Sequence, residues 1–384
     1  MRLVTVSTAI AVSLLASLPA RTLAAQAGSP APAAGNETPG DPAAALASTP
    51  VEAGEGRAVA TKLADDLVQN FVFRDQAEAY AAMLRKNAAA GRYDSGTRRD
   101  VAKLLTDDLQ AVHKDGHLRV MPAAGEGQGP GALRGGPPRN FPPLIQAAKT
   151  IAPGIGYIRF TAFLGRDEEV AAVRKWLAEN KDAKALIFDL RNHHGGGLDE
   201  QDAIFSYLYA AKTPLVKMAI ANDLYKRRGF PVEERASFVV ASADGKMVGT
   251  HFALPGEDTG LRKAKVYLLT SNRSASAAEH FALALKSTGR ATLIGEVTAG
   301  ANHFGGPQRL NANFAVWMPV GRTYDIKTGK DWEGAGIAPD IAVDPKDALV
   351  VALEKAGLSR EEAVKLDALE VPAEPIHSDK VRAR

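Results

Sequence analysis

Three serines lie within six residues in the stretch SNRSASAAEHF, which runs from Ser271 to Phe281 and follows an apolar segment. A serine at such a position has two common uses. Ser276 and Glu279 have the spacing of a capping box, in which each side chain accepts a hydrogen bond from a backbone N–H at the start of a helix. Ser276 could instead be a nucleophile, because the free N–H groups at a helix N-terminus can stabilise an oxyanion. This stretch alone leaves both interpretations open.

A second turn of the same kind occurs earlier in the chain, in the stretch ALIFDLRNHHGGG. An apolar strand leads there into Gly195, Gly196 and Gly197. Glycine has no Cβ, so the backbone N–H groups of such a turn can approach a substrate closely. The loop lacks the GxGxxG spacing, and the Gly-Lys-Ser/Thr, of phosphate-binding loops. It fits half of an oxyanion hole and therefore favours the nucleophile interpretation of Ser276.

Both turns follow strands of a predicted parallel sheet. From Gly154 onward, short apolar runs such as GIGYIRF, KALIFDL and KVYLLT alternate with segments of helical spacing such as DEEVAAVRKWLAEN and LDEQDAIFSYLYAA. Strands that alternate with helices indicate crossover connections and a mostly parallel, buried sheet. In such α/β folds, ligands bind beyond the carboxyl ends of the strands, which is where both turns are expected.

The rest of the chain divides by composition. Arg2, a short apolar core and small residues near Ala25 are typical of a cleavable signal peptide, and the core is too short to span a bilayer. We therefore expect a periplasmic or secreted protein without a stable membrane anchor. The predicted segments are a signal peptide (1–25), a disordered linker (26–56), a helical N-terminal subdomain (57–120), a Gly/Pro-rich connection (121–150), a catalytic domain (151–358) and a C-terminal tail (359–384).

Composition and charge exclude several classes of function. The chain has 384 residues and a net charge of +3, which is too small to indicate a nucleic-acid or anionic-membrane partner. It has no cysteine, which excludes thiol catalysis, disulfides and thiolate zinc sites. His113 and His117 have the spacing of a metal pair, but Gly116 interrupts the helix that would be needed, and no third ligand follows. We expect neither a metal nor another cofactor.

Five stretches, taken together and in order, resemble the tail-specific, or carboxy-terminal processing, serine peptidases of the S41 type, with their tricorn and interphotoreceptor-retinoid-binding-protein branches. The resemblance implies a ClpP/crotonase-like ββα catalytic domain with a mostly parallel sheet beside a small helical subdomain. It makes Ser276 the nucleophile, and Gly195 or Gly196 with the N–H of Ala277 the oxyanion hole. The substrate would be a peptide or protein. The five stretches are KDGHLRV, ALIFDLRNHHGGG, LLTSNRSASAAEHF, RATLIGEVTAGA and DWEGAGIAPDI.

The general base of the processing peptidases is missing at its usual position. Those enzymes use a lysine in the turn after the next strand, where this chain has TAGAN with Ala301. Lys286 cannot replace it, because ten residues of helix place it about 15 Å from Ser276. The tricorn branch uses a histidine and a glutamate, and His117 in DGHLRV and Glu333 in DWEGAGIAPD match these. The resemblance therefore implies a serine peptidase with His117 as base and Glu333 as its acidic partner.

Several other roles remain open for these side chains. His303, just after the turn that lacks the lysine, is an alternative base, and a substrate contact suits it equally well. His193 and His194 precede the glycine turn, and we expect His194 to line the site as a substrate contact. His117 could simply be a polar residue that ends a helix, and Glu333 could anchor the EGAG turn.

Two departures from the processing peptidases affect function. A peptide-binding PDZ module, common in that family, does not fit between DGHLRV and GIGYIRF, so specificity for C-termini is not expected. The missing lysine is also what a non-catalytic relative would show, and the retinoid-binding branch carries small apolar ligands. The alternative function is therefore a non-catalytic binder of peptides or apolar ligands on the same fold. The oligomeric state is not predicted.

Overall fold

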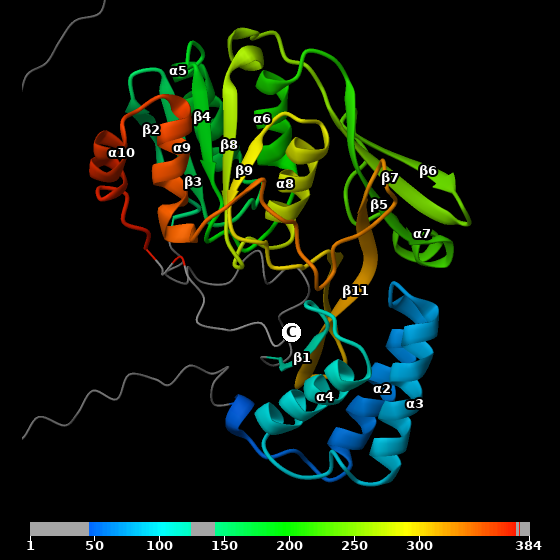
Figure 1. Cartoon of the computed structure of the whole chain (residues 1–384). Helices are drawn as coiled ribbons and strands as arrows, with labels where there is room; N and C mark the ends of the chain where they lie inside the picture. The colour runs from blue at the N-terminus through cyan, green and yellow to red at the C-terminus, as the bar shows by residue number, and fades with distance from the viewer. Residues whose placement is uncertain (1–45, 124–142, 374–375, 377–384) are drawn as a thin grey trace, which may run out of the picture. The chain divides into compact units, whose positions relative to one another are not determined.

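The computed structural model describes residues 46–123, 143–373 and 376 (Figure 1). The expected signal peptide lies outside these residues, as do most of the expected linker and the end of the expected tail. In the described ranges, no helix combines the length and the hydrophobicity needed to cross a membrane.

A six-stranded, mostly parallel sheet forms the centre of the α/β region, in the order β12-β9-β8-β4-β3-β2. Only β2, at one edge, runs antiparallel to its neighbour. This confirms the predicted α/β fold class with its mostly parallel sheet. The strands are β2 (Ile145–Ala152), β3 (Ile155–Phe160), β4 (Ala185–Asp189), β8 (Lys265–Thr270), β9 (Thr292–Gly295) and β12 (Ile341–Ala342).

Helices bury both faces of this sheet (Figure 1). Successive side chains of a strand point to opposite faces, so a strand covered on both sides is apolar throughout. In β4, Phe188 packs edge-on against Phe281 at 5.6 Å, whereas its neighbour Ile187 belongs to a separate cluster with Leu349 and Leu353. One face is covered by α5 (Asp167–Glu179), α6 (Asp199–Leu208) and α8 (Ala277–Ser287), and the other by α9 (Ala348–Ala356) and α10 (Arg360–Asp367).

The structure also contains a second, antiparallel sheet, which was not predicted from the sequence. Its order is β1-β11-β5-β7-β6, and β10 also pairs with β11. The long strand β11 pairs through Trp317 with Arg119 of β1, and through Gly321 with Ile220 of β5. It thereby joins the helical region to the α/β region. The elements are β1 (Arg119–Pro122), β5 (Thr213–Ala221), α7 (Asn222–Arg228), β6 (Phe238–Ala243), β7 (Lys246–Ala253), β10 (His303–Arg309) and β11 (Phe314–Asp325).

The N-terminal region is helical, as predicted, and shares one core with the antiparallel sheet. The helices α2 (Glu55–Asn70), α3 (Arg74–Ala89) and α4 (Arg98–Val112) bury Leu63, Leu84 and Leu105 completely. Burial of each leucine contributes about 1.5–3 kcal/mol. A capping box formed by Thr97 and Asp100 begins α4. Where α4 ends, the chain enters the loop that carries His117.

Two elements lie beyond the domain boundaries that composition suggested. Strand β2 begins at Ile145, inside the expected connection, and α10 begins at Arg360, inside the expected tail. Both were hard to recognise because they bury little: β2 is a half-exposed edge strand, and Ala363 is the only buried residue of α10.

Candidate active site

Ser276 lies in the turn between β8 and α8 and has an unusual backbone conformation. Its φ is 56° and its ψ is −113°, and Asp244 is the only other non-glycine residue with positive φ in the described part of the chain. Such a conformation costs about 1–3 kcal/mol. An ordinary helix cap has an extended backbone, so capping alone does not account for this strain. A sharp, strained strand-to-helix turn is how α/β hydrolases expose a nucleophilic serine.

The other two serines of the stretch have structural roles. Ser271 and Ser274 are fully buried, and their hydroxyls donate to the backbone oxygens of Arg191 and Leu190, respectively. The oxygen of Ser274 also accepts a hydrogen bond from the N–H of Ser271 at 3.0 Å. These bonds tie the turn after β8 to the turn after β4.

The glycine turn after β4 lies directly against Ser276. A Cβ on Gly195 would be 2.8 Å from the Cβ of Ser276 and 3.2 Å from its Oγ, and the φ of Gly195 is 102°. A Cβ on Gly196 would be 1.8 Å from the backbone oxygen of Phe163. Only glycine therefore permits this approach, and the two turns meet at the carboxyl ends of adjacent strands.

The backbone N–H groups of the expected oxyanion hole differ in availability. The N–H of Gly195 donates to Nδ1 of His193 at 3.0 Å, and burial lowers the pKa of His193 to about 3, so that this ring is a neutral acceptor. The N–H groups of Gly196 and Ala277 have no acceptor within the described ranges. Gly196 and Ala277, rather than Gly195, are thus the pair with free donors.

Ser276, Gly196 and Ala277 all line one cavity of about 820 Å³. Its size suits a substrate side chain with the adjoining backbone. Its lining also includes aromatic and apolar side chains, namely Phe163, Leu198, Met218, Phe304 and Trp332.

A buried glutamate joins Ser276 to the turn that holds the lysine in processing peptidases. Oε2 of Glu279 accepts hydrogen bonds from the N–H groups of Ser276 (2.9 Å) and Ala301 (2.8 Å). Its Oε1 accepts from the N–H of Gly300 (2.7 Å) and the hydroxyl of Thr298 (2.6 Å). Position 301 therefore adjoins the nucleophile, but alanine supplies no base. Glu279 was read from the sequence only as a capping residue.

His117 lies in a loop held by two carboxylates. Oδ1 of Asp115 accepts hydrogen bonds from the N–H groups of His117 (2.8 Å) and Leu118 (3.0 Å). The imidazole stacks on Trp317 at 6.3 Å, and its Nδ1 is buried without a hydrogen-bond partner. Burial lowers the pKa of His117, which favours the neutral ring that can accept a proton. No hydrogen bond joins His117 to Ser276 in the part of the chain that is described.

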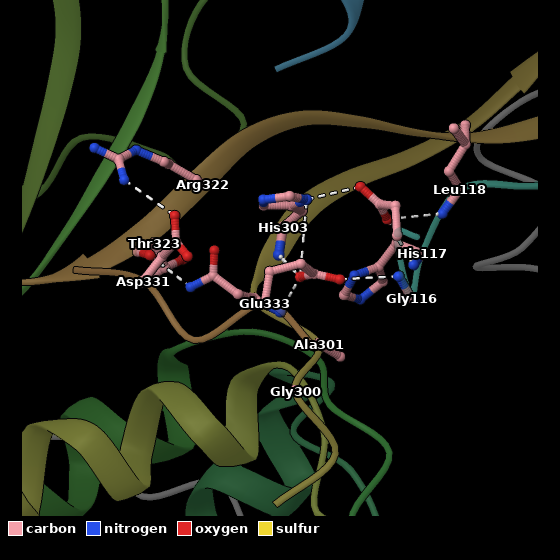
Figure 2. A network of polar contacts seen from close by, with 12 residues as sticks. Gly116, His117, Leu118, Gly300, Ala301, His303, Arg322, Thr323, Asp331 and Glu333 are labelled. Carbon is pink, nitrogen blue, oxygen red and sulfur yellow. Dashed lines mark hydrogen bonds and ion pairs between the residues drawn. The ribbon is translucent and has the colours of Figure 1, made fainter. Parts of the chain in front are cut away.

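Glu333 connects this loop to the turn after Ala301 (Figure 2). Its Oε1 accepts a hydrogen bond from the N–H of Gly116 at 2.8 Å. Its Oε2 accepts from the N–H groups of Asn302 (2.7 Å) and His303 (3.0 Å). The carboxylate makes no hydrogen bond to the ring of His117. Its contacts are those of a clasp between two backbone segments.

His303, the alternative base, is held by an acid. Its Nδ1 lies 2.7 Å from Oδ2 of Asp115, and only 3% of the residue is exposed. Burial acts to lower the pKa of His303, but the hydrogen bond and charge of Asp115 outweigh it, so the pKa is raised. His303 is not part of the cavity lining, and neither is His194, whose ring is exposed and whose N–H donates to the backbone oxygen of Thr161. Their substrate contacts stay predictions.

Asp115, His303 and Glu333 also form a geometric cluster that could hold a cation. One ligand atom from each lies within 4.8 Å of the others. The carboxylate oxygens and the Nδ1, however, already bond to one another or to backbone N–H groups. Hydrogen bonding therefore accounts for these oxygens and for Nδ1, whereas Nε2 of His303 is buried without a partner in the described residues.

A buried ion pair between Asp189 and Arg191 lies just before the glycine turn and stabilises it. Arg191 and Asp189 approach within 2.7 Å, and their side chains are 2% and 1% exposed. Arg159 donates to the same carboxylate at 3.0 Å, and Tyr157 at 2.8 Å. This is the bracing role that Asp189 and Arg191 suggest from their place beside the turn.

Sequence reasoning missed His280, which also lines the cavity. Its only signal is its place four residues after Ser276, since residues with this spacing share one face of a helix.

Comparisons with known proteins place part of this chain in a family. Residues 154–343 match the model of peptidase family S41. Over 206 residues, the chain is 27% identical to a chloroplastic C-terminal processing peptidase of Tetradesmus obliquus, covering 52% of this chain but only 38% of that relative.

Solved structures were compared as well, and one with a TM-score above 0.5 shows a similar fold. A putative peptidase from Parabacteroides merdae aligns with 18% identity and a TM-score of 0.54, over 79% of this chain and 97% of that one. The tricorn protease aligns with 14% identity and a TM-score of 0.48, over 82% of this chain and 36% of that one. Through residues 154–343, the chain belongs to peptidase family S41.

Proposed function

We propose that the protein is a serine peptidase that hydrolyses peptide bonds through an acyl-enzyme on Ser276. The observation that carries this proposal is the strained turn of Ser276 on a cavity that it shares with two free N–H donors, those of Gly196 and Ala277. Membership of peptidase family S41 supports the reaction class.

The proposed reaction has two stages. Oγ of Ser276 attacks the peptide carbonyl carbon, and the carbonyl oxygen becomes an oxyanion that accepts hydrogen bonds from Gly196 and Ala277. The serine proton passes to a base and then to the leaving amine. Water, activated by the same base, hydrolyses the acyl-enzyme and frees Ser276.

We propose His117 as that base. Its neutral ring can accept the proton, and its loop is clasped by Glu333 to the turn that adjoins Ser276 through Ala301. Catalytic hydrogen bonds often close only when substrate is bound, which allows for the missing bond between His117 and Ser276. Asp115 and Glu333 act as positioning residues. His303, already paired with Asp115, serves the same positioning in this scheme.

We also propose a substrate class and a cellular location for the enzyme. The substrate is a peptide or protein, and the predicted signal peptide would direct the chain to the periplasm or the medium. N-terminal sequencing of the protein purified from the medium or periplasm tests this. A mature N-terminus near Ala25 is expected, and an intact Met1 contradicts a cleaved signal peptide.

A fluorophosphonate probe tests the nucleophile. Wild-type protein should be labelled on Ser276, and Ser276→Ala should abolish labelling and peptide hydrolysis. Ser287→Ala, the same change near the other end of α8, is the matched control and should label normally. Labelling that survives in Ser276→Ala contradicts the proposal, and tight binding of an apolar ligand without any labelling supports the non-catalytic alternative.

The same probe tests the base. His117→Ala should slow labelling of Ser276 at least a hundredfold, the lower range of a general base. If His303→Ala abolishes labelling while His117→Ala does not, the base is His303.

A further inference from the structure

Three side chains outside the proposed machinery form a hydrogen-bonded chain that ends at the cavity. Oδ1 of Asp202, on α6, lies 2.8 Å from Nε2 of His251, on β7. Nδ1 of His251 lies 2.8 Å from Nε2 of His280, on α8. Both imidazoles are buried: His251 is 0% exposed and His280 is 4% exposed.

The acid at one end determines where the protons lie. Burial acts to raise the pKa of Asp202, but its hydrogen bonds to His251 and Ser237 and the charge of Arg235 hold it below its ordinary value, so Asp202 is a carboxylate. A carboxylate only accepts, so Nε2 of His251 carries a proton and donates it. Where Nε2 holds the single proton of the His251 ring, its Nδ1 is an acceptor, and Nε2 of His280 donates to it. Nδ1 of His280 is left as a free lone pair.

This lone pair opens on the cavity. His280 is part of the cavity lining together with Ser276, and helical side chains lean towards the N-terminus of their helix, which here is the side of Ser276. Nδ1 of His280 has no hydrogen-bond partner among the described residues. It is also absent from the unpartnered polar atoms that are closed off from solvent, so it has accessible space beside it. The space it reaches is therefore the cavity.

The hydrogen-bonded row of Asp202, His251 and His280 carries little net charge. Arg235 approaches Oδ2 of Asp202 within 2.8 Å and neutralises it. Burial lowers the pKa of His280 well below its ordinary value, so its ring is neutral. Around His251, the rings of Phe205 and Phe238 lie at 5.6 and 6.4 Å and add no charge.

We propose that Nδ1 of His280 determines specificity, by accepting a hydrogen bond from a substrate side chain that is apolar along its length and ends in an uncharged donor. This inference rests on the proposed function and names the substrate class of the same site. The ring of Phe304, which lines the cavity, would pack against the apolar part. At His280 itself, a cation gains nothing from Asp202, which Arg235 neutralises, and an anion is repelled by the lone pair. Peptides with tyrosine, threonine or glutamine before the cleaved bond fit this description.

Matched peptides test the proposal by activity. In three pairs, tyrosine with phenylalanine, threonine with valine, and glutamine with methionine, the members have similar volume and differ in the donor. Wild-type protein should prefer the donor in at least one pair by about tenfold in kcat/KM, the worth of one buried hydrogen bond. His280→Phe should abolish that preference while Ser276 is still labelled by the fluorophosphonate. Equal rates in all three pairs, or a preference unchanged in His280→Phe, overturn the proposal. Loss of labelling in His280→Phe also overturns it, because His280 would then belong to the acid–base machinery.

Binding separates this inference from the proposed function. Calorimetry on Ser276→Ala needs no catalysis, and the donor member of a pair should bind about tenfold more tightly there. If wild-type protein is inert but this difference is found, only the proposed function fails. If all pairs bind equally while wild-type protein cleaves peptides, only the inference fails.

Histidine tautomers give an independent test. Nitrogen NMR of the full chain should find the proton on Nε2 in both His251 and His280. Asp202→Asn, which removes the obligate acceptor, should shift this tautomer balance and weaken the donor preference several-fold, without changing kcat/KM for the apolar member of the pair. A proton on Nδ1 of His280 in the wild-type protein overturns the proposal.

Discussion

Replacing Glu333 with glutamine should release the loop that carries His117. In the wild-type protein, Oε2 accepts two N–H groups, from Asn302 and His303, and Oε1 accepts one, from Gly116. The glutamine oxygen will take the place with two donors, which leaves its NH₂ group facing the N–H of Gly116, formerly 2.8 Å from Oε1. Two donors cannot bond, so the clasp to Gly116 is lost.

The size of the effect follows from that single contact. A hydrogen bond to a charged group contributes about 1.5–3 kcal/mol, so we expect a cost of about 2 kcal/mol. If this entire free energy is lost from the positioning of His117 in the transition state, kcat/KM and the labelling rate of Ser276 drop about 30-fold, since 1.36 kcal/mol corresponds to a factor of ten.

Stopped-flow labelling with a fluorophosphonate, together with thermal unfolding, measures both consequences of Glu333→Gln. Asp331→Asn is the matched control, because it makes the same chemical change two residues away, where the acid pairs with Arg322 at 3.0 Å. It should label at the wild-type rate. If Glu333→Gln lowers the melting temperature but labels Ser276 normally, the clasp does not act through His117, and the reasoning fails.

Three further predictions follow from the same geometry. Gly196→Ala places a Cβ 1.8 Å from a backbone oxygen at a φ of 133°, so labelling of Ser276 should fall more than about a hundredfold. Gly306→Ala is the control, because a Cβ there has nothing within 4 Å, and it should label normally. Equal labelling of both variants would contradict the proposed oxyanion hole. Burial lowers the pKa of His117 in the folded protein, so the labelling rate should stay at its maximum above pH 6.5, the ordinary pKa of histidine. The rate should fall only as the pH drops through the lowered pKa of His117. An inflection of the rate above pH 6.5 argues against His117 as base. Asp189→Asn leaves the buried Arg191 without its counter-charge and should cost about 3–5 kcal/mol in the free energy of unfolding, measured in urea; a loss below about 1 kcal/mol would mean that the brace is unimportant.

Part of the site could be predicted because its geometry is local to the parallel sheet. Ser276 and the glycines after β4 both follow apolar strands, and carboxyl ends of parallel strands share one edge. The pairing of β4 with β8 brings the two turns into contact. Even so, the sequence could not reveal that the N–H of Gly195 already bonds to His193, because that depends on one side-chain rotamer.

The acid and histidine clusters could not be predicted in this way. Gly116 meets Glu333 across 217 positions of the chain, and His251 meets His280 only because β7 packs near α8. Both contacts depend on the antiparallel sheet, whose strands showed too little pattern for their partners to be assigned. The contacts of Glu333 to both backbone segments, and the place of His280 on the cavity, therefore came from the structure alone.

Local patterns along the chain were sufficient for the α/β class, because periodicity and turn chemistry depend on near neighbours. The nucleophile role of Ser276 and the missing lysine at position 301 were predictions that the resemblance to the processing peptidases implied. Tertiary packing alone decided which N–H groups stay free, which acid holds which histidine and which nitrogen faces the cavity. These features depend on hydrogen bonds between segments far apart in the sequence, and they exist only once the two sheets and the helical region pack together.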